Sequence, residues 1–206
     1  AKQKNRRLWV LILGLVINLG ILAVIKYTAF VLTNVNSVLA LFGAGSVAIP
    51  KFILPMGISF FIFQSVGYLI DVYRGNVPAQ KNIISFGAYV TMFPQLIAGP
   101  IVRYSDIAKE LNNRTHSVND FVEGLRRFAV GLAKKILIAN QMGAFVSIFR
   151  ASDEKSVLFF WLYAIAFAIQ IYFDFSGYSD MAIGLGRIFG FHFIENFNYP
   201  YMSKSI

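Results

Sequence analysis

The sequence predicts an all-α, polytopic integral membrane protein, and three observations lead to this fold class. The chain has 206 residues, of which 57% are hydrophobic and only 14% are charged, whereas soluble domains carry about 25% charged residues. Three largely apolar runs, Leu8 to Ile25, Phe52 to Ile70 and Val157 to Phe173, approach the length of a membrane-spanning helix. Aromatic residues make up 16% of the chain, which suits a surface that lies in lipid and at its interface.

The composition also excludes several function classes. The absence of cysteine removes disulfide frameworks, thiolate zinc sites and cysteine nucleophiles. The high hydrophobicity excludes a disordered chain. The formal net charge of +9 could indicate a nucleic-acid partner, but in so apolar a chain an excess of Lys and Arg on the cytoplasmic side of a membrane explains the charge better. We therefore expect membrane lipid, and no nucleic acid, as a partner.

The first predicted span is Leu8 to Ile25, which contains no charged residue and covers roughly 27 Å at a rise of about 1.5 Å per residue. The run is too long for a signal peptide, and no small-residue cleavage site follows it. The basic residues between positions 1 and 7 place its start in the cytoplasm. After it, Thr33 to Pro50 is expected to be a looser segment outside the membrane.

The next apolar run, Phe52 to Ile70, should return the chain to the cytoplasm, where residues 71–76 form a turn. The run that follows, Ile83 to Val102, is interrupted by Pro94, Gly99 and Pro100. Proline inside a helix deletes a backbone hydrogen bond, and seven cations follow between residues 103 and 135. We therefore predict a re-entrant, broken segment that returns to the cytoplasmic side.

The last third of the chain predicts two long helical stretches. Ser117 to Arg150 can be capped by Ser117 or Asn119, and its first half is expected to be an interfacial amphipathic helix. Its second half is short and is expected to enter the bilayer only when packed against other helices. Val157 to Phe173 is a strong span that should end at Asp174.

Two places could carry chemistry. Asp174 and Asp180 lie close to Tyr178 between two apolar stretches, and ionisable groups near membrane depth usually face a cavity or a partner. The alternative is a polar turn at the water boundary that caps the next helix through Ser179 or Asp180. Gln95 lies in the broken segment, where it would either line a cavity or bond to a neighbouring helix at a simple kink.

Other motifs carry little signal. His116 and His192 have no metal-ligand spacing with another His or Cys, so no metal site is predicted, and no phosphate-binding glycine loop occurs. The basic stretch from Arg126 to Lys135 is interpreted as a membrane-surface anchor. It could instead receive an acidic cytosolic donor, such as a nucleotide-bearing acyl carrier.

Six ordered strings together resemble the membrane-bound O-acyltransferase family, in particular its branch that acetylates alginate and peptidoglycan. A sister branch that carries D-alanine to teichoic acid is similar but typically differs in the string Asp-Phe-Ser-Gly-Tyr-Ser-Asp, which here runs from Asp174 to Asp180. The six strings cover nearly the whole chain: Leu54–Gln64, Tyr68–Gly75, Phe93–Arg103, Gly131–Lys135, Tyr172–Gly184 and Glu195–Tyr201.

The resemblance implies a multi-pass protein of the bacterial cytoplasmic (inner) membrane, built as a ring of helices around a tunnel. A cytosolic donor, acetyl-CoA in this branch, would meet a histidine in the tunnel. The acetyl group would pass to an extracytoplasmic polysaccharide, often through an extracytoplasmic acetyltransferase partner protein. No bound cofactor is implied beyond the donor. D-alanyl transfer to teichoic acid is the alternative within the family.

The chain departs from the family pattern in one respect. The family's tunnel histidine lies in a Phe-Trp-Arg-Arg-Trp-His string shortly after Tyr-Pro-Tyr, whereas this sequence ends at Ile206. Residues 1–206 are therefore expected to be a single membrane-domain fragment that lacks the N-terminal helices and the catalytic histidine, and to be inactive alone. The resemblance leaves four tunnel-wall candidates, which are Gln95, Asp174, Tyr178 and Asp180.

Two hypotheses from other classes remain open at this point. The broken segment and the two carboxylates would also suit a transporter or channel, although the sequence offers no inverted repeat. The chain could also be a scaffold that only binds a partner.

Overall fold

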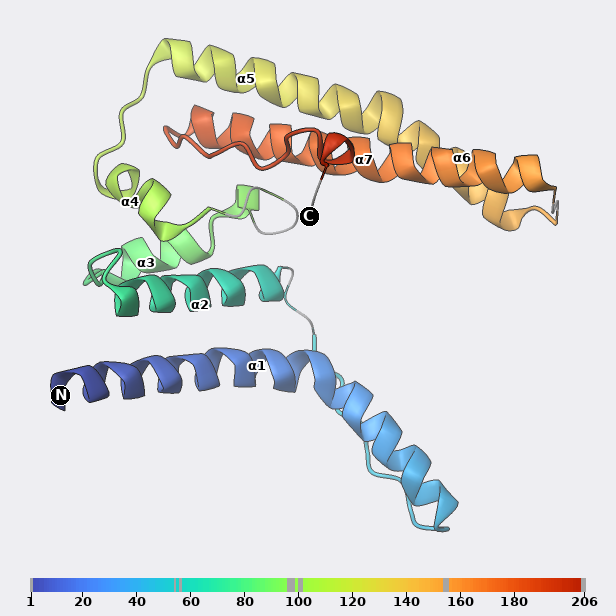
Figure 1. Cartoon of the computed structure of the whole chain (residues 1–206), viewed down its shortest axis with the longest axis horizontal. Helices are drawn as coiled ribbons and strands as arrows, with labels where there is room; N and C mark the ends of the chain where they lie inside the picture. The colour runs from blue at the N-terminus through green and yellow to red at the C-terminus, as the bar shows by residue number, and fades with distance from the viewer. Residues whose placement is uncertain are drawn as a thin grey trace. The chain divides into compact units, whose positions relative to one another are not determined.

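The computed structural model describes residues 2–53, 55, 57–95, 99, 102–153 and 156–204. For residues 2–4 and 95 it describes the backbone alone. Within these residues the chain forms α-helices, two short 3₁₀ helices and one π-helical segment, and no strand (Figure 1). The predicted all-α class is therefore confirmed. The chain divides into two compact units, residues 1–92 with 103–105 and residues 93–102 with 106–206.

The first unit begins with α1 (Lys2–Leu41), which is longer than the predicted span. The expected looser segment, Thr33 to Pro50, is wrong up to Leu41, because the helix continues to that residue, and it is confirmed for residues 42–50, which lie in no helix. The polar side chains there bond back to carbonyls four residues earlier, as Thr33 does to Ala29 at 2.8 Å, and this pattern often bends a helix. Figure 1 shows α1 changing direction along its length.

The chain after α1 is held on that helix by one asparagine. Asn36 accepts a hydrogen bond from the Val47 amide at 2.8 Å and donates one to the Val47 carbonyl at 2.9 Å. This pair of bonds satisfies both backbone groups of Val47, so the extended segment after Leu41 runs back beside the second half of α1.

Helix α2 (Ile58–Arg74) packs against α1 where Gly14 meets Leu69. The helix continues four residues beyond the predicted end at Ile70, because Gly75 provides the left-handed cap that stops it, with φ of 80°. The predicted turn therefore begins at Gly75 rather than at Asp71.

The interrupted run from Ile83 to Val102 contains a short helix, α3 (Ile83–Val90), which Asn82 caps, and a 3₁₀ turn, η1 (Phe93–Gln95). Eight residues of α-helix cover roughly 12 Å, which is too short to cross a bilayer. The predicted break is therefore confirmed. Residues 96–98, 100 and 101 lie outside the described residues, and the re-entrant course stays a prediction.

An aromatic cluster forms the core of the first unit. The ring of Tyr68 lies 4.9 Å from those of Phe86 and Tyr104, and Tyr89 lies 5.3 Å from Tyr104. Gln80 donates to the hydroxyl groups of Tyr68 and Tyr104. Burial raises the pKa of Tyr104 above its ordinary value, so this hydroxyl stays protonated.

Helix α4 (Tyr104–Asn112) begins in the first unit and lies in the second unit from Asp106 onwards. The second unit also contains one long helical rod. The rod consists of α5 (Val118–Ala133), the π-helical segment η2 (Lys134–Ala139) and α6 (Asn140–Ala151). Ser117 caps it as predicted, since its hydroxyl accepts from the Asp120 amide at 3.0 Å. No break separates the expected interfacial half from the expected membrane half.

Helix α7 (Val157–Ile188) runs beside this rod (Figure 1). The predicted end of the span at Asp174 is wrong, because the helix continues for another four turns. The alternative of a polar turn between Asp174 and Asp180 is wrong for the same reason. Both carboxylates lie on the helix itself.

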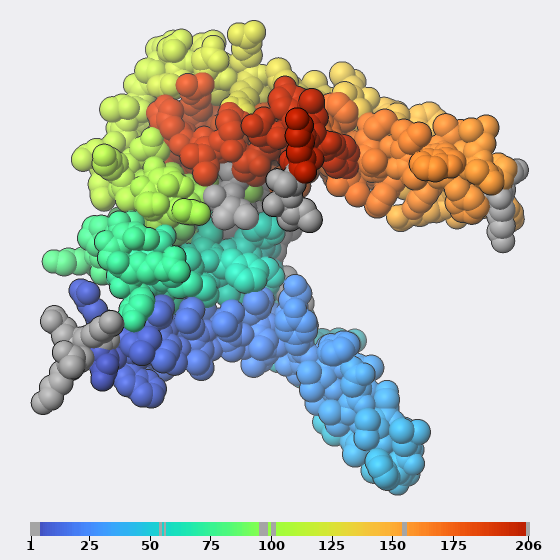
Figure 2. All heavy atoms as spheres, viewed as in Figure 1, coloured from blue at the N-terminus to red at the C-terminus, as the bar shows by residue number. Residues whose placement is uncertain are grey.

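Three helical stretches of the described chain are long and apolar enough to cross a membrane, namely Asn5–Leu41, Val118–Ala151 and Val157–Ile188. Their large apolar side chains are widely exposed: Trp9 is 70% exposed and Trp161 66%. Figure 2 draws the side-chain surfaces of these helices, α1 in blue and α7 in orange to red. Such a surface suits contact with lipid.

Candidate functional site

The second unit brings α5 and α7 together at backbone contact. Gly131 faces Gly177, and Gly124 faces Gly184. A Cβ on Gly131 would lie 2.6 Å from the Gly177 carbonyl oxygen, and one on Gly184 would lie 2.6 Å from the Gly124 carbonyl oxygen. Only glycine fits at such crossings, as is typical of helices that pack closely in membranes.

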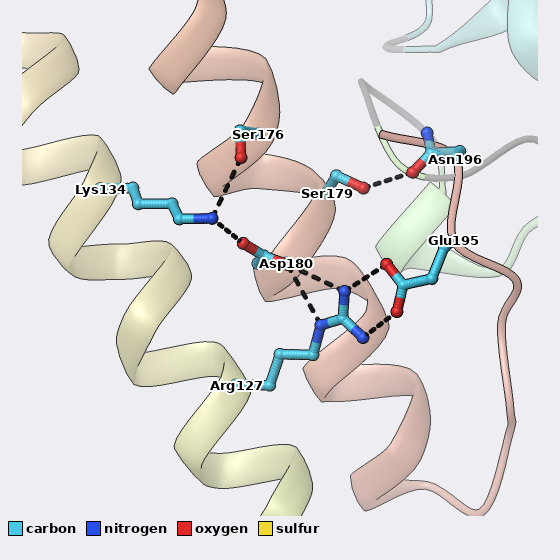
Figure 3. A network of polar contacts seen from close by, with 7 residues as sticks. All are labelled: Arg127, Lys134, Ser176, Ser179, Asp180, Glu195 and Asn196. Atoms are coloured by element: carbon cyan, nitrogen blue, oxygen red, sulfur yellow. Dashed lines mark hydrogen bonds and ion pairs between the residues drawn. The ribbon is translucent and has the colours of Figure 1, made fainter. Parts of the chain in front are cut away.

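The glycine spacing places one opposite-charge pair between these two contacts. Arg127 follows Gly124 by three residues and precedes Gly131 by four, and Asp180 has the same relation to Gly177 and Gly184. Residues three and four apart share a helix face. The Arg127 guanidinium donates to Asp180 Oδ1 from Nη2 at 2.9 Å and from Nε at 3.1 Å (Figure 3).

Two further charged groups complete the network. Lys134 Nζ donates to Asp180 Oδ2 at 2.6 Å and to the Ser176 hydroxyl at 3.1 Å. Both terminal nitrogens of Arg127 donate hydrogen bonds to the Glu195 carboxylate, and the distance from Nη2 to Oε2 is 2.5 Å. Two cations and two carboxylates therefore compensate one another, which lowers the cost of placing charge beside apolar helices.

The π-helical turn at Lys134 lets two consecutive lysines reach α7. Lys134 pairs with Asp180, while Lys135 pairs with Asp174, which lies six residues earlier on α7. A π-helix has more residues per turn than an α-helix, so the angle about the helix axis between two consecutive side chains is smaller. Such turns inside α-helices are frequent at functional sites.

The segment after α7 returns along the network. Gly190, with φ of 76°, reverses the chain, and Asn196 then accepts a hydrogen bond from the Ser179 hydroxyl (Figure 3). Further along, the Tyr201 hydroxyl donates to the Ala168 carbonyl at 3.1 Å. Together with the pair between Glu195 and Arg127 of α5, these bonds fix residues 195–201 against α5 and α7.

These groups line a pocket of about 620 Å³. One side is charged and polar, and the other is aromatic, which is the usual composition of a site for a small organic group. Its wall contains Arg127, Lys134, Ser176, Ser179, Asp180, Glu195 and Asn198 on the polar side and Tyr172, Phe173, Phe197 and Tyr199 on the aromatic side.

The four sequence-predicted site residues have different positions. Asp180 lies in the pocket wall at the centre of the network. Asp174 pairs with Lys135 outside the wall, and Tyr178 is half-buried and also outside it. The Gln95 side chain lies outside the described residues. The structure therefore brings one of the four candidates into this pocket.

The sequence interpretation missed the partners of Asp180. The sequence pattern favours a membrane-surface anchor for Arg127 and Lys134, and it gives Glu195 no role beyond the string that this residue begins. One signal could have found the first of them: both helices carry two glycines seven residues apart with a charge three residues after the first glycine, positive on one helix and negative on the other.

The two histidines lie apart from the pocket. His116 is exposed in the loop before α5. His192 Nδ1 lies 2.9 Å from Glu110 Oε1, and its Nε2 lies 3.6 Å from Asp120 Oδ1. Among the described residues, no three His, Asp or Glu side chains gather as they would around a metal ion.

Comparison with known proteins gives one family. The profile of the membrane-bound O-acyltransferase family matches residues 17–204. The probable alginate O-acetylase of Pseudomonas aeruginosa is 47% identical over 95% of this chain and 38% of its own length. The peptidoglycan O-acetyltransferase of Helicobacter pylori is 36% identical over 98% of the chain and 42% of its own length.

A more distant relative belongs to the D-alanine branch. The teichoic acid D-alanyltransferase of Bacillus subtilis is 26% identical over 73% of the chain and 39% of its own length. The chain thus spans between 38% and 42% of the length of these three relatives.

Proposed function

The chain belongs to the membrane-bound O-acyltransferase family, and on this premise we propose that the protein moves an acetyl group from cytosolic acetyl-CoA to a polysaccharide outside the cytoplasmic membrane. One observation favours acetyl over D-alanyl as the transferred group. The chain is 47% identical to an O-acetylase over 95% of its length, but only 26% identical to a D-alanyltransferase over 73% of its length.

The pocket between α5, α7 and residues 195–199 is proposed as part of the path of the acyl group. An acetyl thioester is uncharged, and the pocket offers it aromatic rings beside hydroxyl groups. The paired charges keep the helices in register without leaving a free ion to trap a substrate. Asp180 is accordingly a positioning residue in this proposal, because it acts through Arg127 and Lys134.

The surroundings of the reaction are part of the same proposal. Three apolar helices and the basic residues before Leu8 support a multi-pass protein of the cytoplasmic membrane. The acceptor receives the acetyl group directly or through an extracytoplasmic acetyltransferase partner. The named substrates of the relatives, alginate and peptidoglycan, are the first acceptors to test.

The test is an acyl-transfer assay on membranes that contain the full-length protein. Acetyl-CoA labelled in the acetyl group is supplied on the cytosolic side, and base-labile ester on alginate or peptidoglycan is measured. We expect acetyl ester to form and Asp180→Asn to lower its rate. D-alanyl ester without acetyl ester would favour the second branch, and solute flux without any ester would favour a transporter.

A further inference from the structure

A second pocket lies in the first unit, away from the charge network. It has a volume of about 410 Å³ and is formed by the first turns of α1, the last turns of α2 and the loop that follows. Arg6 and Arg7 contribute two guanidinium groups, and Tyr73 and Ala79 complete the wall. The remaining lining is aliphatic and consists of Val10, Leu11, Leu69 and Val72.

The two ends of this pocket differ in chemistry. Arg6 and Arg7 are exposed, and the described residues that line the pocket include no carboxylate. Asp71, the acidic residue closest along the chain, accepts a hydrogen bond from the Asn76 side chain at 3.0 Å instead. The arginine end is therefore an uncompensated positive site that lies beside an apolar wall.

The position of the arginines along α1 sets their depth. The uncharged stretch of the helix begins at Leu8, directly after Arg7, so the guanidinium groups lie at the boundary of the hydrocarbon core, where lipid phosphates are found. Val10 and Leu11 continue into the core. A basic pocket between helices at this level is the usual form of a site for anionic lipid headgroups.

We propose that this pocket binds one anionic phospholipid from the cytoplasmic leaflet. Arg6 and Arg7 hold its phosphate through bidentate hydrogen bonds, and the first part of an acyl chain lies on Val10 and Leu69. A free phosphate or a nucleotide would use the arginines but leave the aliphatic wall without a partner. This proposal does not depend on the acyl-transfer function.

The bound lipid would lie between α1 and α2 and contact both helices. Below the pocket, α1 and α2 are in contact where a Cβ on Gly14 would lie 2.8 Å from Leu69 Cδ1. At the pocket the helices leave room that the side chains of the described residues do not fill. A bound phospholipid would supply the missing contacts on both helices at once.

The test uses the full-length protein in a neutral detergent, freed of bound lipid. Dioleoylphosphatidylglycerol and dioleoylphosphatidylcholine are titrated separately, and bound lipid is counted by native mass spectrometry. We expect the anionic lipid to bind at least about tenfold more tightly. Arg6→Gln with Arg7→Gln should weaken its binding about thirtyfold, from two lost cations near the surface.

Two further variants separate a pocket from general attraction to charge. Lys109→Gln with Arg126→Gln removes the same number of charges at exposed positions elsewhere and should change binding less than twofold. Val10→Trp fills the pocket and keeps both arginines, and should weaken binding as strongly as the double arginine change. The helical circular dichroism of each variant confirms that it is folded.

Three results would overturn the proposal. Unchanged lipid binding by Val10→Trp would mean that the arginines attract anionic surfaces without a pocket. Equal affinity for the two lipids would remove the role of the phosphate charge. Displacement of the lipid by acetyl-CoA or inorganic phosphate at similar concentration would identify a phosphate site instead.

Discussion

Asp180 is the residue on which the charge network of the second unit depends. It accepts hydrogen bonds from Arg127 and Lys134 with a side chain that is 16% exposed, whereas Asp174 pairs with Lys135 alone at 45% exposure. The two aspartates lie on the same helix and differ in burial and in number of partners. They therefore offer a matched pair for testing what the network contributes.

We expect Asp180→Asn to destabilise the protein by about 1–3 kcal/mol, below the cost of breaking a fully buried pair, because Arg127 keeps Glu195 as a partner. Asp174→Asn should cost less than about 1 kcal/mol, as exposed pairs do. Thermal unfolding in detergent and acetyl transfer measure both effects. Equal losses in the two variants would show that the network has no special role.

Arg127 bridges two carboxylates that lie on different segments, and lysine cannot reproduce this geometry. We expect Arg127→Lys to lower acetyl transfer about tenfold, the factor that corresponds to about 1.4 kcal/mol. Glu195→Gln should cost much less in the Arg127→Lys background than in the original protein, because the shared bond is already lost. If the losses of acetyl transfer caused by the two changes were additive, Arg127 would not act by joining the two carboxylates.

At the scale of helices, the glycine contacts between α5 and α7 decide whether the charges can meet. Gly131→Ala would place a Cβ 2.6 Å from a backbone carbonyl oxygen, so the helices must separate. We expect a loss of about 1–3 kcal/mol, as for other overpacked sites, together with reduced acetyl transfer. Both are measured on the same detergent-solubilised preparation.

Gly20→Ala is the control for this change. Its Cβ would meet no atom within 4 Å, and alanine favours a helix over glycine by about 1 kcal/mol. The control should therefore be neutral or more stable. A Gly20→Ala variant that loses as much stability as Gly131→Ala would remove the packing explanation.

The sequence predicts the helices better than their ends. The Ser117 cap and the break near Pro94 depend on a few adjacent residues, so local reasoning finds them. The continuation of α7 past Asp174 depends on Lys134, Lys135 and Arg127 of another helix, which pair with its carboxylates. The polar string on α7 alone resembles a turn because these partners are not visible in it.

The same limit applies to the candidate site. Asp180 could be selected because an ionisable residue near apolar stretches is costly wherever it lies. Its partner Arg127 is 53 positions away in the sequence, and Glu195 is 68 positions from Arg127. Only the close packing at the paired glycines brings these groups together, and packing of this kind is a property of two helices rather than of one pattern.

At the scale of the whole molecule, the positive charge and the three candidate spans predict one topology. The basic residues before Leu8 and those between residues 103 and 135 should lie on the cytoplasmic side. If the helical rod Val118–Ala151 crosses the bilayer, the loop between α6 and α7 lies outside, and α7 returns the chain. This topology also requires that α2, which has 17 residues and is not among the three candidate spans, returns the chain to the cytoplasmic side. It further requires that the segment 83–102 does not cross.

Single cysteines test this topology, because the chain contains none of its own; any thiol elsewhere in the full-length protein is first replaced. In intact cells, a membrane-impermeant maleimide should label Asp153→Cys and leave Asn5→Cys and Asn113→Cys unlabelled until the membrane is opened. All three positions are exposed. Labelling of Asn113→Cys from outside would mean that the broken segment crosses the bilayer or that α2 does not return the chain, and either result would contradict this topology.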